Sequence, residues 1–163
     1  MNTPGGSRNT LNGRLFIGLM SGTSLDGVDG VLARFLPGHA PNVLAHASLP
    51  MPHALRNDLL ALNSSGSDEL HRAALAANTL VSLYAQVVQQ LLAQHHCQPE
   101  SVTAIGAHGQ TVRHRPDLGF TIQLNAPALL AELTRIDVIA DFRSRDIAAG
   151  GQGAPLVPPF HAA

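Results

Sequence analysis

Leu15-Phe-Ile-Gly-Leu-Met-Ser-Gly-Thr-Ser-Leu-Asp-Gly-Val28 joins two apolar runs through a turn rich in glycine, serine and threonine. The first run, Leu15 to Met20, has the pattern of a buried strand, and the second extends from Val28 to Phe35. Two strands that are joined by such a turn predict a β-hairpin. Asn42 to Leu49 is expected to add a third strand, so the domain should open with three antiparallel strands.

Helices then alternate with buried strands. We expect helices at 52–63, 67–96 and 127–134. The second is a long amphipathic helix for which Ser67 is a suitable N-cap. Strands are expected at 102–107, 120–124 and 136–140. This order predicts an α/β protein, with a mixed sheet that opens on an antiparallel hairpin and helices packed against it.

Composition narrows the possible functions. All ten basic residues are arginine, which excludes the lysine-dependent Walker A loop and Schiff-base chemistry on lysine. The net charge of -1 and two short basic spots fall short of the charged stripe that nucleic acid or an anionic membrane requires, so neither partner is expected. The single cysteine, Cys97, fits a reducing cytoplasm. Residues 1–13 lack the apolar core of a signal peptide and are expected to be a disordered lead-in.

The turn after the first strand is a candidate phosphate site. Gly22 and Gly27 would let backbone N–H groups approach an anion, because glycine tolerates positive φ and adds no side chain. Thr23 and Ser24 add hydroxyl donors. Asp26 would fit beside a phosphate only if Mg²⁺ or its waters lay between them. The alternative is an ordinary hairpin turn that needs glycine and serine for its shape alone.

Two further polar segments follow buried strands. His108 and Gln110 come at the carboxyl end of strand 102–107, where open sheets present ligand contacts. His108 could bond a substrate hydroxyl or act as a general base, or it could be a structural histidine.

The second of these segments runs from Asp141 to Gly153. In an extended backbone Arg143 and Arg145 would share a face, with Asp141 and Asp146 orienting them toward a carboxylate. The alternative for this segment is a solvated loop with internal ion pairs.

Taken together, three strings resemble the anhydro-N-acetylmuramic acid kinases in order and spacing. They are Gly18 to Asp29, Gly106-Ala-His-Gly-Gln-Thr111 and Asp141 to Pro158. The resemblance implies an actin/hexokinase-like (ribonuclease H-like) fold of two lobes, with residues 14–163 as the N-terminal nucleotide-binding lobe. It implies a cytoplasmic enzyme of peptidoglycan recycling that uses Mg²⁺-ATP and water to convert 1,6-anhydro-N-acetylmuramic acid to N-acetylmuramic acid 6-phosphate.

The resemblance also implies roles for individual residues. Arg143 matches an arginine that helps to hold the sugar, through its lactyl carboxylate, and Asp26 is the expected Mg²⁺ contact through water. His108, Gln110 and Asp141 are the other candidates for substrate binding. For full-length members of the family, the resemblance leaves a homodimer as one alternative for the oligomeric state. The expected ATP-binding segment comprises Gly22, Thr23, Ser24, Leu25, Asp26, Gly27, Val28 and Asp29.

The chain departs from that family in length and at local positions. Members run to more than twice this length, and their second lobe, with the catalytic aspartate base, has no counterpart here, so the chain alone is expected to be inactive. The alternatives are a module that retains weak MgATP binding and a truncated remnant without function. Asn125 and Ala126 replace a glycine and a polar residue, Ser144 replaces an arginine, and Arg135 replaces a glycine that would cap the helix at 127–134.

Overall fold

A computed structural model of the chain describes residues 13–156. Apart from Gly13, the expected lead-in at 1–13 lies outside the described residues, as does the end of the third string, Val157 and Pro158. The first strand begins at Arg14, as expected. Among the helices of the described part, none is long and apolar enough to cross a membrane.

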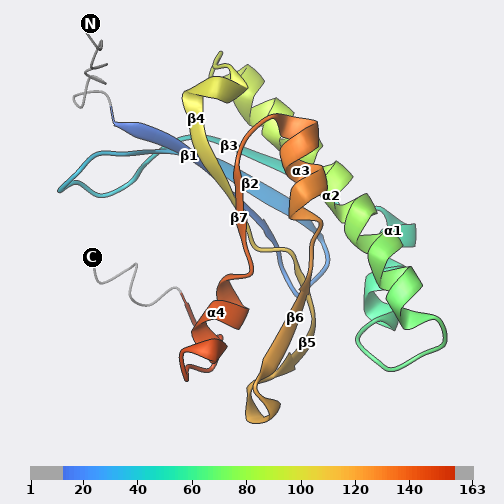
Figure 1. The fold of residues 1–163 in the computed structure, drawn as a ribbon. Helices are drawn as coiled ribbons and strands as arrows, with labels where there is room; N and C mark the ends of the chain where they lie inside the picture. Colours follow the sequence, from blue (N-terminus) through green and yellow to red (C-terminus); the bar gives the residue numbers. More distant parts are fainter. Residues whose placement is uncertain (1–12, 157–163) are drawn as a thin grey trace, which may run out of the picture.

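A mixed five-stranded sheet in the order β3-β2-β1-β4-β7 forms the centre of the molecule (Figure 1). The antiparallel meander of β1 (Arg14–Ser21), β2 (Gly27–Phe35) and β3 (Asn42–Pro50) confirms the three predicted strands. On the other side of β1, β4 (Val102–Ala107) and β7 (Val138–Ala140) pair in parallel. Because β1, β4 and β7 run in the same direction, their carboxyl ends lie at one edge of the sheet.

Helices α2 (Glu69–Gln94) and α3 (Pro127–Thr134) cover one face of this sheet, and α1 (His53–Ala61) packs beside α2 (Figure 1). Along α2 the buried residues recur at helical spacing, as the sequence predicts, and pack on β2 and β3. The approach is close at Gly30, where an added Cβ would lie 2.4 Å from Cγ1 of Val87. Glycine at this position therefore lets the long helix lie directly on the strand.

The opposite face of the sheet is largely open and partly apolar. Met20 and Ile139 point to this side and are 50% and 57% exposed. Phe16 and Phe35 share the same face, with their rings edge to face at 5.3 Å. A short helix, α4 (Phe142–Ala148), lies on this side of the sheet, just after β7 (Figure 1).

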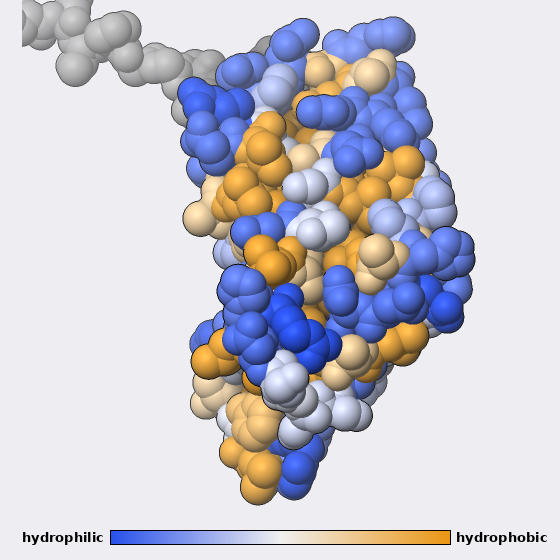
Figure 2. Space-filling view, turned by 90° about the vertical axis from the view of Figure 1, so that its right-hand side faces the viewer, coloured by the Kyte–Doolittle hydropathy of each residue, from blue (hydrophilic) through white to orange (hydrophobic). Residues whose placement is uncertain are grey.

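A two-stranded hairpin projects beyond the sheet. It consists of β5 (Gln110–Arg115) and β6 (Phe120–Leu124), which are joined by the 3-10 turn η3 (Pro116–Leu118). Strand β6 was expected and β5 was not. A second 3-10 turn, η2 (Pro99–Ser101), leads into β4. Figure 2, which views the helix-bearing side, shows hydrophobic and hydrophilic residues intermixed and an apolar group at the lower tip, where this hairpin ends.

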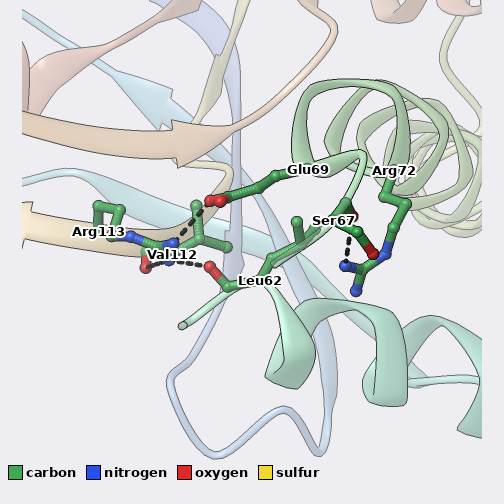
Figure 3. A network of polar contacts seen from close by, with 6 residues as sticks. All are labelled: Leu62, Ser67, Glu69, Arg72, Val112 and Arg113. Atoms are coloured by element: carbon green, nitrogen blue, oxygen red, sulfur yellow. Dashed lines mark hydrogen bonds and ion pairs between the residues drawn. The ribbon is translucent and has the colours of Figure 1, made fainter. Parts of the chain in front are cut away.

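Arg113 ties the hairpin to the connection between α1 and α2 (Figure 3). Its Nη2 donates to Oε1 of Glu69 at 2.6 Å, and the pair is only partly exposed. Its Nη1 donates to the carbonyl oxygens of Leu62 and, at 3.0 Å, of Val112. One guanidinium therefore joins the end of α1, the start of α2 and β5.

Three local predictions fare differently. Ser67 is not the N-cap of α2: Asp68 takes that place in the left-handed region, and the carbonyl of Ser67 accepts a bond from Arg72 instead. Arg135 lies at the C-cap of α3 with a φ of 60°, so this helix ends on an arginine where the family pattern has glycine, as expected. The segment after Asp141 is not extended but forms α4, so Arg143 and Arg145, two residues apart on a helix, do not share a face.

Candidate functional site

The three strings singled out in the sequence meet at one edge of the sheet. Leu19, Ala107 and Ala140 are cross-strand neighbours at the carboxyl ends of β1, β4 and β7. The backbone N–H of His108 donates to the carbonyl of Leu19 at 3.0 Å, which fixes the first two strings against each other. The residues that follow these strands therefore share one site, although they lie far apart in the sequence.

The turn between β1 and β2 differs from the expected glycine turn. Gly22 and Gly27 do not have a positive φ; the left-handed residue is Leu25, with a φ of 56°. Its N–H donates to the carbonyl of Gly22 at 3.1 Å, and its side chain is 2% exposed in the core. A buried leucine thus anchors the turn. Gly27 is required for another reason, since a Cβ there would lie 2.4 Å from the carbonyl oxygen of Leu49 in β3.

Anchoring by Leu25 leaves the polar residues of the turn accessible. Thr23, Ser24 and Asp26 are exposed, while the side chain of Val28 is buried with that of Leu25. Any contact that Leu25 or Val28 makes with a nucleotide would therefore come from the backbone. Asp29 points to the open face of the sheet, where its Oδ1 lies 3.5 Å from Nε2 of His46.

A buried polar junction holds the first turn to the second string. The hydroxyl of Ser21 donates to the carbonyl of Gly109 at 3.3 Å and lies 3.2 Å from the hydroxyl of Tyr84 on α2. Burial raises the pKa of Tyr84 to about 12, and its hydrogen bond with Ser21 opposes that rise. A buried serine whose hydroxyl is bonded to both Tyr84 and Gly109 is a structural element of this junction.

Arg143, at the start of α4, reaches across to the loop after β4. Its Nε donates to Nε2 of His108 at 2.9 Å, and its Nη1 donates to the carbonyl of Gly153 at 2.6 Å. The N–H of Gly153 in turn donates to Oδ2 of Asp146 at 2.8 Å, which folds the glycine-rich segment back on the helix. Asp146 therefore helps to orient Arg143 only through Gly153, and within residues 13–156 no ion pair joins Asp141 or Asp146 to Arg143 or Arg145. The alternative of a loop with internal ion pairs is wrong for the same reason.

Burial lowers the pKa of His108, and the charge of Arg143 lowers it further, while its hydrogen bond with the Gly109 carbonyl opposes both. Nδ1 of the ring lies 2.7 Å from that carbonyl oxygen. Both ring nitrogens are therefore engaged inside the protein. The structure favours the alternative of a histidine with satisfied bonds.

The Arg143–His108 pair lies in the wall of a concavity of about 900 Å³ on the open face of the sheet. Its floor is the bare backbone of Gly18 and Gly106, which are cross-strand neighbours. Phe142 forms part of the wall, and its ring would lie 3.5 Å from a Cβ placed on Gly106. The concavity is therefore mainly apolar, with the Arg143–His108 pair and the Asp29–His46 pair as the polar groups of its wall, which is the usual character of a small-molecule site.

The other predicted substrate residues differ in accessibility. Asp141 is exposed, at the N-terminus of α4, with a φ of 65°. Gln110 is 3% exposed, and its side-chain oxygen is buried without a partner. Asn125, one of the departures from the family pattern, donates from Nδ2 to the carbonyl of Ala107 at 3.2 Å and accepts from the N–H of Ala126 at 3.0 Å. The asparagine thus holds the turn before α3 against the end of β4.

Sequence reasoning missed Ser21 and Tyr84, because the hydrogen bond that joins them spans 63 positions. The one available signal was a lone tyrosine on the apolar stripe of α2, whose buried hydroxyl needs a partner. For Mg²⁺ the fit is limited to the exposed carboxylate of Asp26 beside two hydroxyls. In the described part of the chain no three His, Cys, Asp or Glu side chains form a group that could hold a metal ion.

Comparison with known proteins gives consistent matches. The family model described as anhydro-N-acetylmuramic acid kinase matches residues 14–163. The anhydro-N-acetylmuramic acid kinase of Bordetella petrii is 72% identical over 163 residues, which cover 100% of this chain and 43% of the relative. That of Bordetella pertussis is 73% identical over 161 residues, with 99% and 42% coverage, and that of Variovorax paradoxus is 65% identical over 155 residues, with 93% and 41%. The chain thus spans about two fifths of the length of these relatives.

Proposed function

The chain belongs to the family of anhydro-N-acetylmuramic acid kinases, and from this we propose that it is the N-terminal, nucleotide-binding lobe of such a kinase. The proposed reaction consumes Mg²⁺-ATP, water and 1,6-anhydro-N-acetylmuramic acid and yields N-acetylmuramic acid 6-phosphate and ADP, in the recycling of peptidoglycan in the cytoplasm. Water opens the anhydro bridge at C1, and O6 receives the γ-phosphoryl group. The base for this step would lie in the part of the relatives that the chain does not span.

One observation carries the proposal: the three strings that resemble the family converge at the carboxyl ends of β1, β4 and β7. In open α/β sheets this edge is where ligands bind. An actin/hexokinase-like lobe is supported by the strand order β3-β2-β1-β4-β7, in which an antiparallel meander continues into parallel strands. The second lobe of that fold would face the same edge.

The turn at 22–29 is the proposed ATP segment. The exposed hydroxyls of Thr23 and Ser24 are donors for phosphate oxygens, and the carboxylate of Asp26 is an oxygen ligand of the kind that Mg²⁺ and its waters prefer. Bound Mg²⁺ would neutralise charge on the transferred phosphoryl group. Gly22, Leu25, Gly27 and Val28 would shape the turn, and Asp29 would lie at its margin. Arg143 is the proposed partner of the lactyl carboxylate, with His108, Gln110 and Asp141 around it.

Thermal unfolding in the presence of MgATP tests the nucleotide half of the proposal. We expect millimolar MgATP to raise the unfolding temperature of the chain, because a ligand that binds only the folded state stabilises it. The shift should fall sharply in Asp26→Asn and persist in Asp58→Asn, which removes the same charge from an exposed position on α1. Equal shifts in the two variants, or with ATP in the absence of Mg²⁺, would contradict the assignment of Asp26.

A turnover assay tests whether the chain alone is catalytically active or acts only as one lobe of the enzyme. These 163 residues with MgATP and 1,6-anhydro-N-acetylmuramic acid should give no N-acetylmuramic acid 6-phosphate, because the proposed base lies in the part of the relatives that the chain does not span. Robust turnover would refute that part of the proposal. No stabilisation by MgATP would favour a remnant without function over a module that retains nucleotide binding.

A further inference from the structure

The hydrogen bonds around His108 determine which ring nitrogen carries the proton. An arginine Nε–H can only donate, so Nε2 of His108, 2.9 Å away, must present its lone pair. The carbonyl oxygen of Gly109 can only accept, so Nδ1, 2.7 Å away, must carry the proton. Both bonds are satisfied only by a neutral ring in the Nδ1–H form.

The same contacts orient the guanidinium of Arg143. It has five N–H donors in a rigid planar fork, of which one is given to His108 and one to Gly153. The bond to Gly153 is itself supported from Asp146 through the N–H of Gly153. Three donors remain, including both on Nη2, and Arg143 lines the apolar concavity. An arginine held on two sides loses little rotamer freedom when an anion binds to the remaining edge.

From this geometry we propose that His108 is a positioning residue: its neutral ring, protonated on Nδ1, holds Nε of Arg143 so that the free Nη edge faces the carboxylate of a sugar acid. The inference rests on the proposed function for the identity of the sugar. It assigns His108 no proton transfer, because the lone pair that a general base would use is already occupied. Direct contact of His108 with a substrate hydroxyl is likewise excluded while the bond to Arg143 persists.

Nitrogen NMR of the unliganded chain tests the first step without any sugar. We expect the His108 ring to show a protonated Nδ1 and an unprotonated, hydrogen-bonded Nε2, and the Nε–H resonance of Arg143 to shift in His108→Ala. His71→Gln, an exposed position on α2, is the control and should leave the Arg143 resonance unchanged. A ring protonated on Nε2, or an Arg143 resonance that does not respond to His108→Ala, would overturn the inference.

Binding of two matched sugars tests the second step. N-acetylmuramic acid carries the lactyl carboxylate and N-acetylglucosamine lacks it, so only the first should engage Arg143. We expect Arg143→Lys and His108→Ala each to weaken binding of N-acetylmuramic acid about tenfold, the change that follows from losing roughly one charge-assisted hydrogen bond. His108→Gln should recover much of the loss, because its side-chain oxygen can accept from Nε near the position of Nε2.

The outcomes separate the two proposals. If wild type prefers N-acetylmuramic acid and His108→Ala binds it equally well, the positioning role is wrong while the sugar site stands. A His108→Gln variant as weak as His108→Ala would also count against positioning. If wild type shows no preference between the sugars, the proposed sugar contact fails, and the ring tautomer and the Arg143 resonance alone decide the role of His108.

Discussion

At the scale of single residues, buried polar and strained positions surround the site. Tyr84 and Ser21 place two hydroxyls in the core directly beneath the loop that carries His108. Leu25, a non-glycine residue with positive φ, is held in place by its buried side chain. Such positions persist only where the surrounding structure over-determines them, and here they fix the shape of the proposed phosphate turn.

The raised pKa of Tyr84 predicts that the protein loses stability at alkaline pH. It is the sole tyrosine of the chain, and its pKa is raised from 10.0 to about 12. Between these values the folded state retains a proton that the unfolded state releases, so stability must fall as pH rises, by about 2–3 kcal/mol in total. Urea unfolding below pH 10 and near pH 12 measures the loss, and tyrosinate absorbance reports the ionisation directly.

Tyr84→Phe is the matched variant for that measurement. It should begin about 1 kcal/mol less stable, because Ser21 loses a partner, and its stability should then depend much less on alkaline pH. An alkaline loss of the same size in Tyr84→Phe would assign the effect to other groups.

Arg135 predicts that a single substitution stabilises the protein. Its φ of 60° at the C-cap of α3 places a Cβ in a region that costs L-residues roughly 1–2 kcal/mol. Arg135→Gly should therefore raise the free energy of unfolding by about 1 kcal/mol, measured by urea titration. Arg135→Ala, which also loses the exposed 3.5 Å pair with Glu132 but keeps the Cβ, should bring no gain.

At the scale of elements, the spacing of apolar residues predicted those strands and helices whose buried residues recur regularly along the chain. The strands β1 to β4 and the stripe of α2 follow from apolar spacing and are confirmed. Strand β5 was missed because Gln110 to Arg115 contains one apolar residue, Val112, and depends on pairing with β6. Helix α4 was missed because seven residues with three charges give no readable period.

The sequence predicted which residues belong to the site better than it predicted how those residues contact one another. The sequence named His108 and Arg143 but could not join them, because their contact requires β7 to lie beside β4. It expected glycines to shape the phosphate turn, whereas long-range packing of Leu25 does so. Interactions between residues far apart in the chain leave no local pattern to read.

The Arg113 contact predicts how the β5–β6 hairpin is held. Arg113→Ala should destabilise the protein by about 1–2 kcal/mol, because the carbonyl of Leu62 and the carboxylate of Glu69 lose a charged donor (Figure 3). Amide hydrogen exchange should accelerate most in β5 and β6. Arg72→Ala, which removes a partly exposed arginine with one 3.4 Å bond to the carbonyl of Ser67, is the control and should change little. If amide exchange accelerated equally over the whole sheet, Arg113 would not act specifically on the β5–β6 hairpin.

At the scale of the whole molecule, the sheet is covered on one face and open on the other. The open face carries Met20, Phe35, Val43 and Ile139, all exposed. Exposed apolar side chains on one face of a sheet are typical of a surface on which another part of a protein packs. The chain spans about two fifths of its relatives, so the remaining portion is the natural partner to test.

We expect the C-terminal portion of a full-length relative, produced separately, to bind this chain and raise its unfolding temperature. Binding of a hydrophobic dye to the chain alone should fall on addition of the partner. Ile139→Ser should weaken the association, whereas Leu70→Ser, which removes an 89% exposed leucine from the start of α2 on the helix-bearing side, should not. Equal weakening by the two variants would mean that the open face is not the surface of contact.

Because β1 pairs in parallel with β4, it is synthesised well before the strand that completes its hydrogen bonding. Ser21, the last residue of β1, leaves the ribosome 81 residues before Val102 begins β4, a delay of roughly 4–16 s at about 5–20 residues per second. During that interval the central strand of the finished sheet is an edge strand with unpaired backbone groups. We therefore expect the nascent meander β1–β2–β3 to bind holding chaperones until β4 is synthesised, and slow codons between α2 and β4 to prolong the exposure of its edge.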